Sequence, residues 1–170
     1  MSRATVVGLL EMGLVALAFA TALAVPALRT VFHDGRVGAP RPRDLLWLLL
    51  VCIPFGTVII EEVAFRGVMP ALFGGGELWQ WKAVLPAAML FGLWHALPSL
   101  ALGQNAMVQA NFGDLPLTAV SVLAMLAAAG AGIVLHRCRH TGRSLLTPVL
   151  VHLATNSGGL LVAWWLMAHH

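Results

Sequence analysis

The chain has 170 residues, of which 59% are hydrophobic and only 10% are charged, and its formal net charge is +3 at pH 7. Soluble globular domains carry about 25% charged residues, so this composition excludes an ordinary soluble domain and indicates an integral membrane protein. The positive charges lie in short loops between apolar runs, and no basic tail is present. That distribution fits the positive-inside rule and argues against a nucleic-acid partner.

Five apolar segments are long enough to cross the bilayer, since a spanning helix needs about 20 mostly apolar residues. In chain order, the predicted spans are residues 6–31, 45–73, 79–101, 115–135 and 145–167. Pro54 and Gly56 predict a kink in the second span, and the Ala/Gly run 127–132 predicts close helix packing in the fourth. We therefore predict an all-α fold, a polytopic transmembrane helix bundle of about five spans. Residues 1–170 form a single membrane domain, with a motif core at 58–160.

Two arginine-rich loops complicate this topology. The first loop carries Arg36, Arg41 and Arg43, and the last carries Arg137, Arg139 and Arg143. Both should face the cytoplasm, but five alternating spans would place them on opposite sides. Either the rule fails for this chain, or the segment 98–114 is an extra re-entrant segment that changes the parity. In both cases we expect a multi-pass protein of the cell (plasma) membrane, surrounded by the lipid bilayer.

Polar side chains inside the predicted spans are the candidate functional residues. Each ionisable group in a membrane costs about 2.5–3.5 kcal/mol on insertion scales, so such groups should point inward and meet each other or water. The spans contain Glu61, Glu62 and Arg66 (second span), His95 (third span), and His152 and Asn156 (fifth span). We expect these six side chains, from three helices, to gather in one wet pocket.

Helical spacing divides the carboxylates between two roles. Glu62 and Arg66 are four residues apart and can form an ion pair on one helix face. Glu61 points about 100° away from Glu62, so it is the candidate general base. The alternative for the Glu62–Arg66 pair is a purely structural one, a link between helices.

The histidines and the asparagine complete the predicted site. His95 could share the attacking water with Glu61, while His152 and Asn156 could donate hydrogen bonds to an oxyanion. A bundle histidine and an interhelical hydrogen-bonding pair are the structural alternatives. We assign no role to His33, His136 and His140, which fall outside the predicted spans, and we interpret tryptophans within the spans as packing or lipid-facing residues.

These six residues stand in three motifs, and a fourth motif lies just before the last of them. The stretch 61–67 (EEVAFRG) resembles the E-E-x-x-x-R motif of the CPBP family, the CAAX-protease and bacteriocin-processing membrane proteases. The stretch 91–95 (FGLWH) matches its F-x-x-x-H motif, and 152–156 (HLATN) matches its H-x-x-x-N motif. The stretch 139–148 is similar to the R-T-G-S-L-x-x-P turn of the family, with one extra residue.

The resemblance implies a multi-span α-helical protease. Eukaryotic relatives remove the C-terminal tripeptide of prenylated proteins, and bacterial ones are linked to bacteriocin maturation or self-immunity. By the motif match, Glu61 would activate water with His95, and His152 and Asn156 would support the oxyanion. Glu62 and Arg66 would have a structural or electrostatic role.

A metal is an open question. The family is often labelled as metalloproteases, and Glu61, His95 and His152 with a water would meet the pattern of a catalytic zinc site. However, the sequence has no HExxH pair, and a metal would compete with Glu61 as the base. We prefer metal-free water activation and keep zinc as the alternative, so no cofactor is certain.

The sequence therefore predicts an intramembrane endopeptidase that hydrolyses a peptide bond of a membrane-associated or lipidated protein or peptide. Two alternatives remain: a non-catalytic bacteriocin-immunity or scaffold membrane protein, and a small transporter that uses the ionisable groups as a relay. Clustering of the polar groups favours the enzyme. Nothing in the sequence identifies the substrate.

Overall fold

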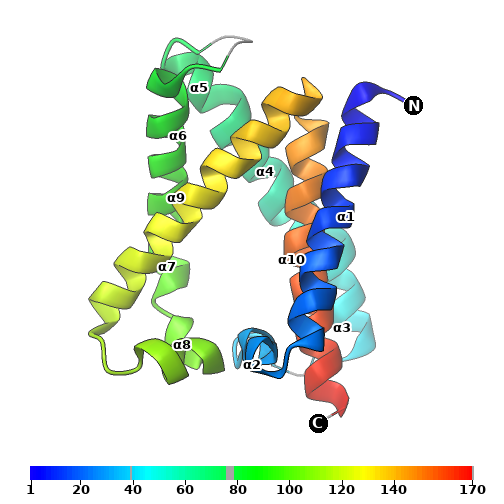
Figure 1. The fold of residues 1–170 in the computed structure, drawn as a ribbon, viewed down its shortest axis with the longest axis vertical. Helices are drawn as coiled ribbons and strands as arrows, with labels where there is room; N and C mark the ends of the chain where they lie inside the picture. Colours follow the sequence, from blue (N-terminus) through cyan, green and yellow to red (C-terminus); the bar gives the residue numbers. More distant parts are fainter. Residues whose placement is uncertain (39, 76–78, 170) are drawn as a thin grey trace.

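The computed structural model describes residues 1–38, 40–75 and 79–169, and it is built from helices (Figure 1). The helices are α1 (Arg3–Ala24), α2 (Pro26–Arg29), η1 (Thr30–Phe32), α3 (Pro42–Trp47), η2 (Leu48–Val58), α4 (Ile59–Glu62), η3 (Val63–Val68), α5 (Met69–Leu72), α6 (Trp81–Trp94), α7 (Ala96–Ser99), η4 (Leu102–Gln104), α8 (Ala106–Phe112), α9 (Leu117–Gly142) and α10 (Leu146–His169). Within these described ranges there is no β-strand, so the prediction of an all-α fold is confirmed.

Four helical segments are long and apolar enough to cross a membrane. They are residues 3–24, 42–72, 117–142 and 146–168, and the bent pair 81–94 and 96–104 gives a fifth segment if it is counted as one span. Their bounds lie close to the five predicted spans. The protein is therefore a multi-pass membrane protein, as predicted.

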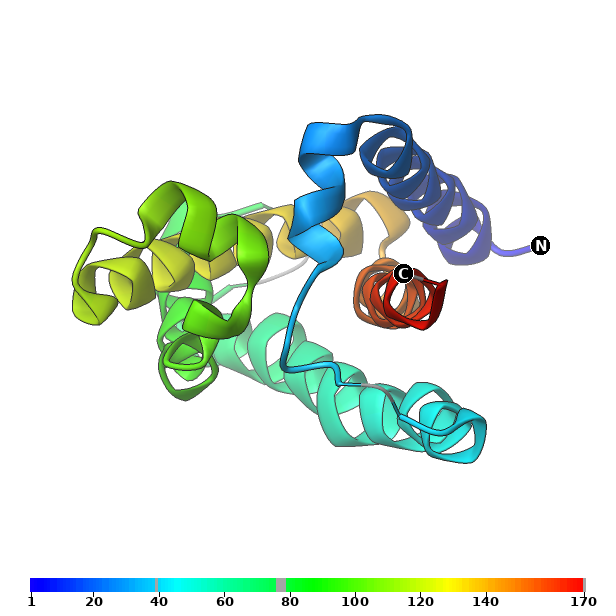
Figure 2. The same cartoon turned by 90° about the horizontal axis from the view of Figure 1, so that it is seen from below.

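The spans form a three-sided arrangement. Helix α1 lies along α10, α6 lies along α9, and the segment from α3 to α5 forms the third side, which is clearest when the molecule is viewed from below (Figures 1 and 2). Helix α10 contacts both η2 and α4, and α6 contacts η3. These contacts bring the middle of the second span against the third and fifth spans, which carry the other candidate residues.

Close packing of α6 on α9 depends on a glycine. A Cβ atom on Gly92 would lie 2.5 Å from the carbonyl oxygen of Met125 and 3.0 Å from the Cβ of Ala129. A side chain at this position would therefore push the two helices apart. Ala129 belongs to the Ala/Gly run from which close packing was predicted, and this contact confirms that prediction.

The second span winds loosely in two places. The Ile59 N–H bonds to the carbonyl of Pro54, and the Met69 N–H bonds to the carbonyl of Ala64, each five residues earlier. Such π-helical turns absorb a proline inside a helix and are frequent at functional sites. Pro54 thus lies inside a wide helical segment of a span that runs from residue 42 to 72, and the kink at Pro54 stays a prediction. The short helix α4, with Glu61 and Glu62, lies between the two wide segments.

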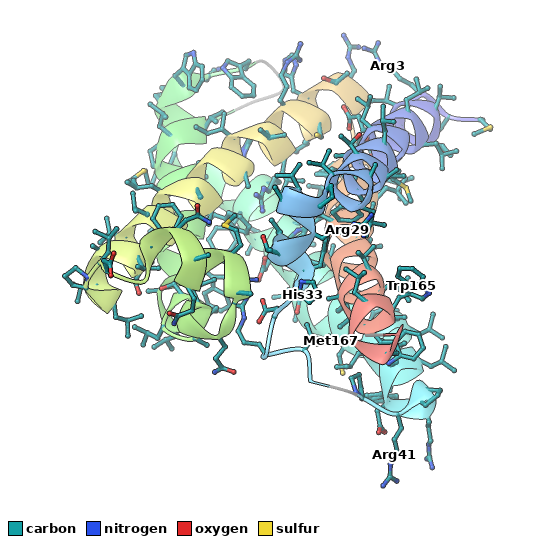
Figure 3. The ribbon with its side chains drawn as sticks, turned by 60° about the horizontal axis from the view of Figure 1, so that its bottom comes forward. Arg3, Arg29, His33, Arg41, Trp165 and Met167 are labelled. Carbon is teal, nitrogen blue, oxygen red and sulfur yellow. The ribbon has the colours of Figure 1, made fainter. Side chains whose placement is uncertain are left out.

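The third span breaks at His95. Helix α6 ends there, and the chain bends by 48° into the segment 96–104. The Arg3 Nε bonds to the carbonyl of Thr141 at the arginine-rich end of α9, which was predicted as a loop, whereas Arg41, in the first arginine-rich loop, lies at the opposite end of the molecule (Figure 3). The two arginine-rich segments therefore lie at opposite ends, and the parity change that a re-entrant segment 98–114 would have produced is not observed.

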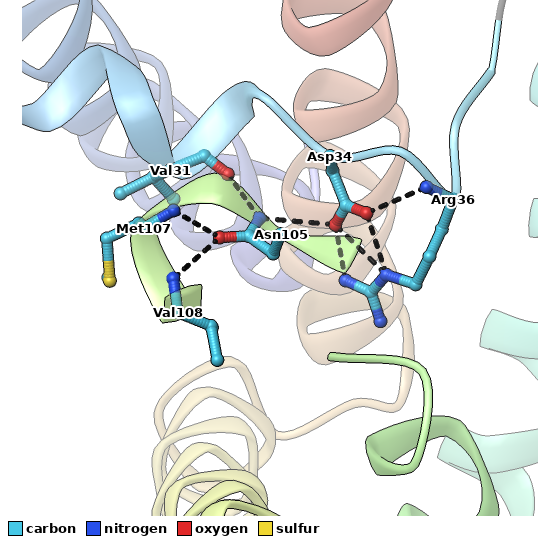
Figure 4. A network of polar contacts seen from close by, with 6 residues as sticks. All are labelled: Val31, Asp34, Arg36, Asn105, Met107 and Val108. Atoms are coloured by element: carbon cyan, nitrogen blue, oxygen red, sulfur yellow. Dashed lines mark hydrogen bonds and ion pairs between the residues drawn. The ribbon is translucent and has the colours of Figure 1, made fainter. Parts of the chain in front are cut away.

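A polar network ties the first loop to the end of the third span (Figure 4). The Asn105 amide nitrogen donates to the Val31 carbonyl at 2.8 Å and to Asp34 Oδ2 at 3.3 Å. The Arg36 Nε donates to Asp34 Oδ1 at 2.8 Å. Asn105 also caps α8, because its side-chain oxygen accepts from the Met107 N–H. One buried asparagine thus joins two segments that are about 70 residues apart in the chain.

Candidate active site

Glu62 is at the centre of a buried polar cluster. Its Oε1 accepts from Arg66 Nη1 at 3.1 Å and lies 2.7 Å from Nδ1 of His152. Glu62 and Arg66 are both fully buried, and His152 is 7% exposed. The predicted Glu62–Arg66 ion pair is present, and it connects α4 and η3 to α10 through His152.

Glu61 points to a different helix, as the 100° rotation between neighbouring residues predicts. Its Oε1 accepts from the indole Nε1 of Trp94 on α6 at 2.9 Å. Its Oε2 lies 3.9 Å from Nε2 of His152, which is beyond direct hydrogen-bond distance. That Oε2 atom is buried and has no partner among the described residues. The structure therefore places Glu61 beside His152 with one carboxylate oxygen uncommitted.

His95 lies at the break between α6 and α7 and is half-buried. Its Nδ1 is 2.8 Å from the carbonyl oxygen of Phe91, and its ring lies 4.6 Å from the Phe91 ring. A carbonyl oxygen can only accept, so Nδ1 carries the proton, and the neutral ring keeps a lone pair on Nε2. The Phe91 ring is also 6.2 Å from the ring of His152, so both histidines have an edge contact with the same phenylalanine ring.

The proton of the His152 ring can be placed as for His95, and this changes the predicted role of His152. Ionised Glu62 can only accept, so Nδ1 of His152 donates to it. A neutral His152 then has no proton on Nε2 and cannot donate to an oxyanion. The prediction that His152 acts as a neutral donor therefore disagrees with this geometry, and His152 would need a second proton to serve in that way.

Asn156 lies one helical turn after His152 on α10 and is half-buried. No hydrogen bond of its side chain occurs within the described part of the chain. Its amide can donate without a change of charge. Asn156 is thus the neutral donor of the candidate set.

Aromatic rings line the cluster. The guanidinium carbon of Arg66 lies 4.0 Å from the centre of the Phe91 ring, a cation–π contact. The Phe65 ring is 5.2 Å from Phe91 and 6.1 Å from Trp94. These rings fix the orientation of Arg66 and of the Trp94 indole, and they keep the Glu62–Arg66 pair away from lipid.

Trp94 is a candidate functional residue that sequence reasoning missed. It was interpreted as a packing or lipid-facing residue, yet its indole donates to Glu61 although the residue as a whole is 58% exposed. The available signal was its place directly before His95 in the F-x-x-x-H motif. Position within a motif, and not hydrophobicity, was the useful indicator.

The residues fit a metal only in part. His95 and His152 each donate from Nδ1 to an oxygen, the arrangement that usually supports a metal-bound Nε2. However, no group of three His, Cys, Asp or Glu side chains in the described ranges has the arrangement of a metal site. Glu61, His95 and His152 are therefore not gathered around a common point, and no step below is routed through a metal.

The chain matches the model of a known protein family. A family model described as type II CAAX prenyl endopeptidase Rce1-like matches residues 43–158, which is more than half of the chain and contains all six candidate residues. The searches of curated proteins and of solved structures gave no significant match.

Proposed function

This chain belongs to the Rce1-like type II CAAX prenyl endopeptidase family, and we propose that it hydrolyses a peptide bond of a membrane-associated or lipidated protein or peptide with water activated by Glu61. Family membership supports a CAAX-type endopeptidase in general. The observation that carries the water mechanism is the free, buried Oε2 of Glu61, 3.9 Å from Nε2 of His152. A water bonded to both atoms would lie between two proton acceptors.

In the proposed reaction, the water oxygen forms a bond to the carbonyl carbon of the peptide while Glu61 takes a proton from the water. The carbonyl oxygen becomes an oxyanion, which accepts from the amide of Asn156. Glu61 then returns the proton to the peptide nitrogen, the C–N bond breaks, and an amine leaves. A water has two hydrogens, so His95 Nε2, which is also an acceptor, would hold it only in place of His152 Nε2.

Three further residues, Glu62, Arg66 and Trp94, orient His152 and Glu61. Glu62, neutralised by Arg66, holds Nδ1 of His152 and so directs its other nitrogen toward Glu61. Trp94 fixes the remaining oxygen of Glu61. Glu61 and His152 are thus each held by one partner, Trp94 and Glu62 respectively, and such second contacts keep the geometry of a site.

The test is a cleavage assay with purified protein in liposomes and a synthetic farnesylated C-terminal peptide, with the released tripeptide measured by mass spectrometry. Glu61→Gln keeps an oxygen that accepts from Trp94 but cannot take a proton, so we expect activity to fall about 10²–10⁴-fold. Glu11→Gln is the matched control, because it neutralises a glutamate in another span. A folded Glu61→Gln protein with wild-type activity would reject catalysis by Glu61.

The same assay addresses the non-catalytic alternative. If the wild-type protein cleaves neither farnesylated nor unmodified membrane peptides, while it remains folded, a scaffold or immunity role is favoured. An unmodified peptide cleaved as well as the farnesylated one would show that the lipid is not recognised.

A further inference from the structure

A polar cavity lies where α9 turns into α10, and its lining includes none of the six candidate catalytic residues. Its volume is about 460 Å³, and it lies between α5, the start of α6 and the end of α9. The polar and aromatic lining residues that carry the argument are Trp79, Gln80, His136, Arg139, Arg143 and Ser144. His136 was expected in a loop, but α9 continues to Gly142, so His136 lies inside this helix.

The described lining of the cavity contains two arginines and no acidic residue. Two other arginines at this end are committed elsewhere, since Arg3 donates to the Thr141 carbonyl and Arg137 donates to the Thr141 hydroxyl, each at 3.0 Å. Arg139 and Arg143 have no side-chain partner among the residues that the structure describes. No acidic residue belongs to the described lining. An anion in this cavity would meet two uncommitted guanidinium groups, which form strong charge-assisted hydrogen bonds to phosphate.

Buried polar atoms in the lining also lack partners. His136 is only 5% exposed, and its Nε2 has no hydrogen-bond partner in the described part of the chain. The side-chain oxygen of Gln80 is likewise buried and without a partner there. Such atoms are rare in folded proteins and usually mark a place where water or a ligand binds. Gln80 Oε1 could accept from a hydroxyl group next to the anion. His136 bonds to the Gly132 backbone through its other ring nitrogen, so its Nε2 is likewise an acceptor for such a hydroxyl.

The position of the cavity indicates where the anion comes from. The turn lies between two candidate spans, residues 117–142 and 146–168, so it belongs at the surface of the bilayer. Trp79 and Trp81 stack edge to face at 5.0 Å beside it, and tryptophan is enriched at the level of the lipid headgroups. Basic pockets between spanning helices bind phosphate-bearing headgroups.

We propose that this cavity binds a phosphate group, held by Arg139 and Arg143, with an anionic phospholipid headgroup as its source. The site is separate from the peptidase chemistry, and it would anchor the α9–α10 turn to the anionic surface of one leaflet. A soluble phosphate compound would present the same group, and the experiment below separates the two sources.

The test uses the full-length protein in neutral detergent, titrated with phosphatidylglycerol, with inorganic phosphate and with phosphatidylcholine. Binding is followed by native mass spectrometry and by the shift of Tm. We expect saturable binding of phosphatidylglycerol and no comparable binding of phosphatidylcholine. Arg139→Gln should weaken binding about tenfold, the loss expected for one hydrogen bond to a charged group. Arg137→Gln removes the same charge two residues away, outside the lining of the cavity, and should leave the affinity unchanged.

A second variant guards against a folding defect. Arg143 has φ = 53°, a left-handed conformation that Asn tolerates well. Arg143→Asn should therefore fold normally and also weaken binding about tenfold. Binding of phosphatidylglycerol that inorganic phosphate does not displace assigns the site to lipid, and displacement or direct binding of phosphate assigns it to a soluble source. Equal affinity of the wild type, Arg139→Gln and Arg143→Asn for both probes, or binding of neither by the wild type, would overturn the proposal.

Discussion

His152 donates from Nδ1 to Oε1 of Glu62 across 2.7 Å, and this contact joins the fifth span to the second. The same oxygen accepts from Arg66, so Oε1 of Glu62 has two partners, whereas its Oε2 is buried without a partner among the described residues. The other nitrogen of His152 faces Glu61. The imidazole of His152 therefore lies between the two adjacent glutamates. Glu62 accepts the hydrogen bond that orients the ring, and Glu61 lies near the other ring nitrogen.

The first prediction concerns the buried Glu62–Arg66 pair. Removing one partner leaves an uncompensated buried charge, so Glu62→Met alone or Arg66→Met alone should destabilise the protein by about 3–5 kcal/mol. The double variant removes both charges, and it should recover much of that loss. The measurement is a double-mutant cycle of thermal or denaturant unfolding in detergent.

Activity separates the stabilising role of this pair from its role in orientation. The double variant should stay poorly active even where its stability is restored, because Nδ1 of His152 has lost its acceptor. If the double variant cleaves peptide at the wild-type rate, Glu62 does not orient His152 for the reaction.

The second prediction concerns Trp94. Trp94→Phe removes the indole N–H that bonds to Glu61 but keeps an aromatic ring beside Phe65. A hydrogen bond to a charged group contributes roughly 1.5–3 kcal/mol, so kcat/KM should fall about tenfold or more. Trp81→Phe, on the same helix and away from the cluster, is the matched control and should behave as the wild type does. Equal kinetics for the two variants would show that the Trp94 bond is unimportant for Glu61.

Sequence reasoning predicted the spans and the Glu62–Arg66 pair well, because both follow from local patterns. Apolar runs longer than a bilayer's width have few alternative folds, and a spacing of four residues on a helix brings two side chains together wherever that helix lies. The i,i+4 rule depends on one helix only, so no knowledge of tertiary packing was needed.

The partners of Glu61 and His152 could not be predicted in the same way. Trp94 reaches Glu61, and His152 reaches Glu62, only because α6 and α10 pack against the second span in a particular rotation. The wide helical segments η2 and η3 change the rotation of the second span. Pro54 is a sequence signal for η2, and η3 has none. The acceptor on Nδ1 of His152, which decides whether a neutral His152 can donate from Nε2, was likewise not visible in the sequence.

The third prediction concerns helix packing. Gly92→Ala places a methyl group against the Met125 carbonyl, which is backbone and cannot move aside alone. Overpacking of this kind typically costs about 1–3 kcal/mol, and it should also shift Phe91 and His95 and so lower activity. Gly130→Ala is the matched control, because a Cβ there meets nothing within 4 Å. Thermal unfolding of both variants, followed by tryptophan fluorescence, tests the difference. Equal unfolding temperatures would mean that α6 and α9 are not in such close contact.

The fourth prediction is a pH dependence at the Asp34 network, which lies between the first two spans. Side-chain hydrogen bonds from Arg36 hold the pKa of Asp34 below its usual value, although burial acts in the opposite direction. A carboxyl group with a lowered pKa contributes stability that is fully present above its unfolded pKa, about 3.9, and is lost as pH falls through the folded value. The Tm of the wild type should therefore drop more steeply below about pH 4 than that of Asp34→Asn. Asp114→Asn neutralises an exposed aspartate as a control and should follow the wild type.

The last prediction concerns metal dependence. Glu61 Oε2 and His152 Nε2 are 3.9 Å apart, and no third ligand joins them among the described residues. If water is activated by Glu61 alone, the cleavage rate should be unchanged after the protein is treated with 1,10-phenanthroline and dialysed, with residual metal measured by mass spectrometry. A catalytic zinc would need three protein ligands, which here would require His95 to move toward Glu61 and His152. Loss of activity on chelation, with recovery on adding zinc, would therefore replace the metal-free mechanism with one in which these three residues close around the ion.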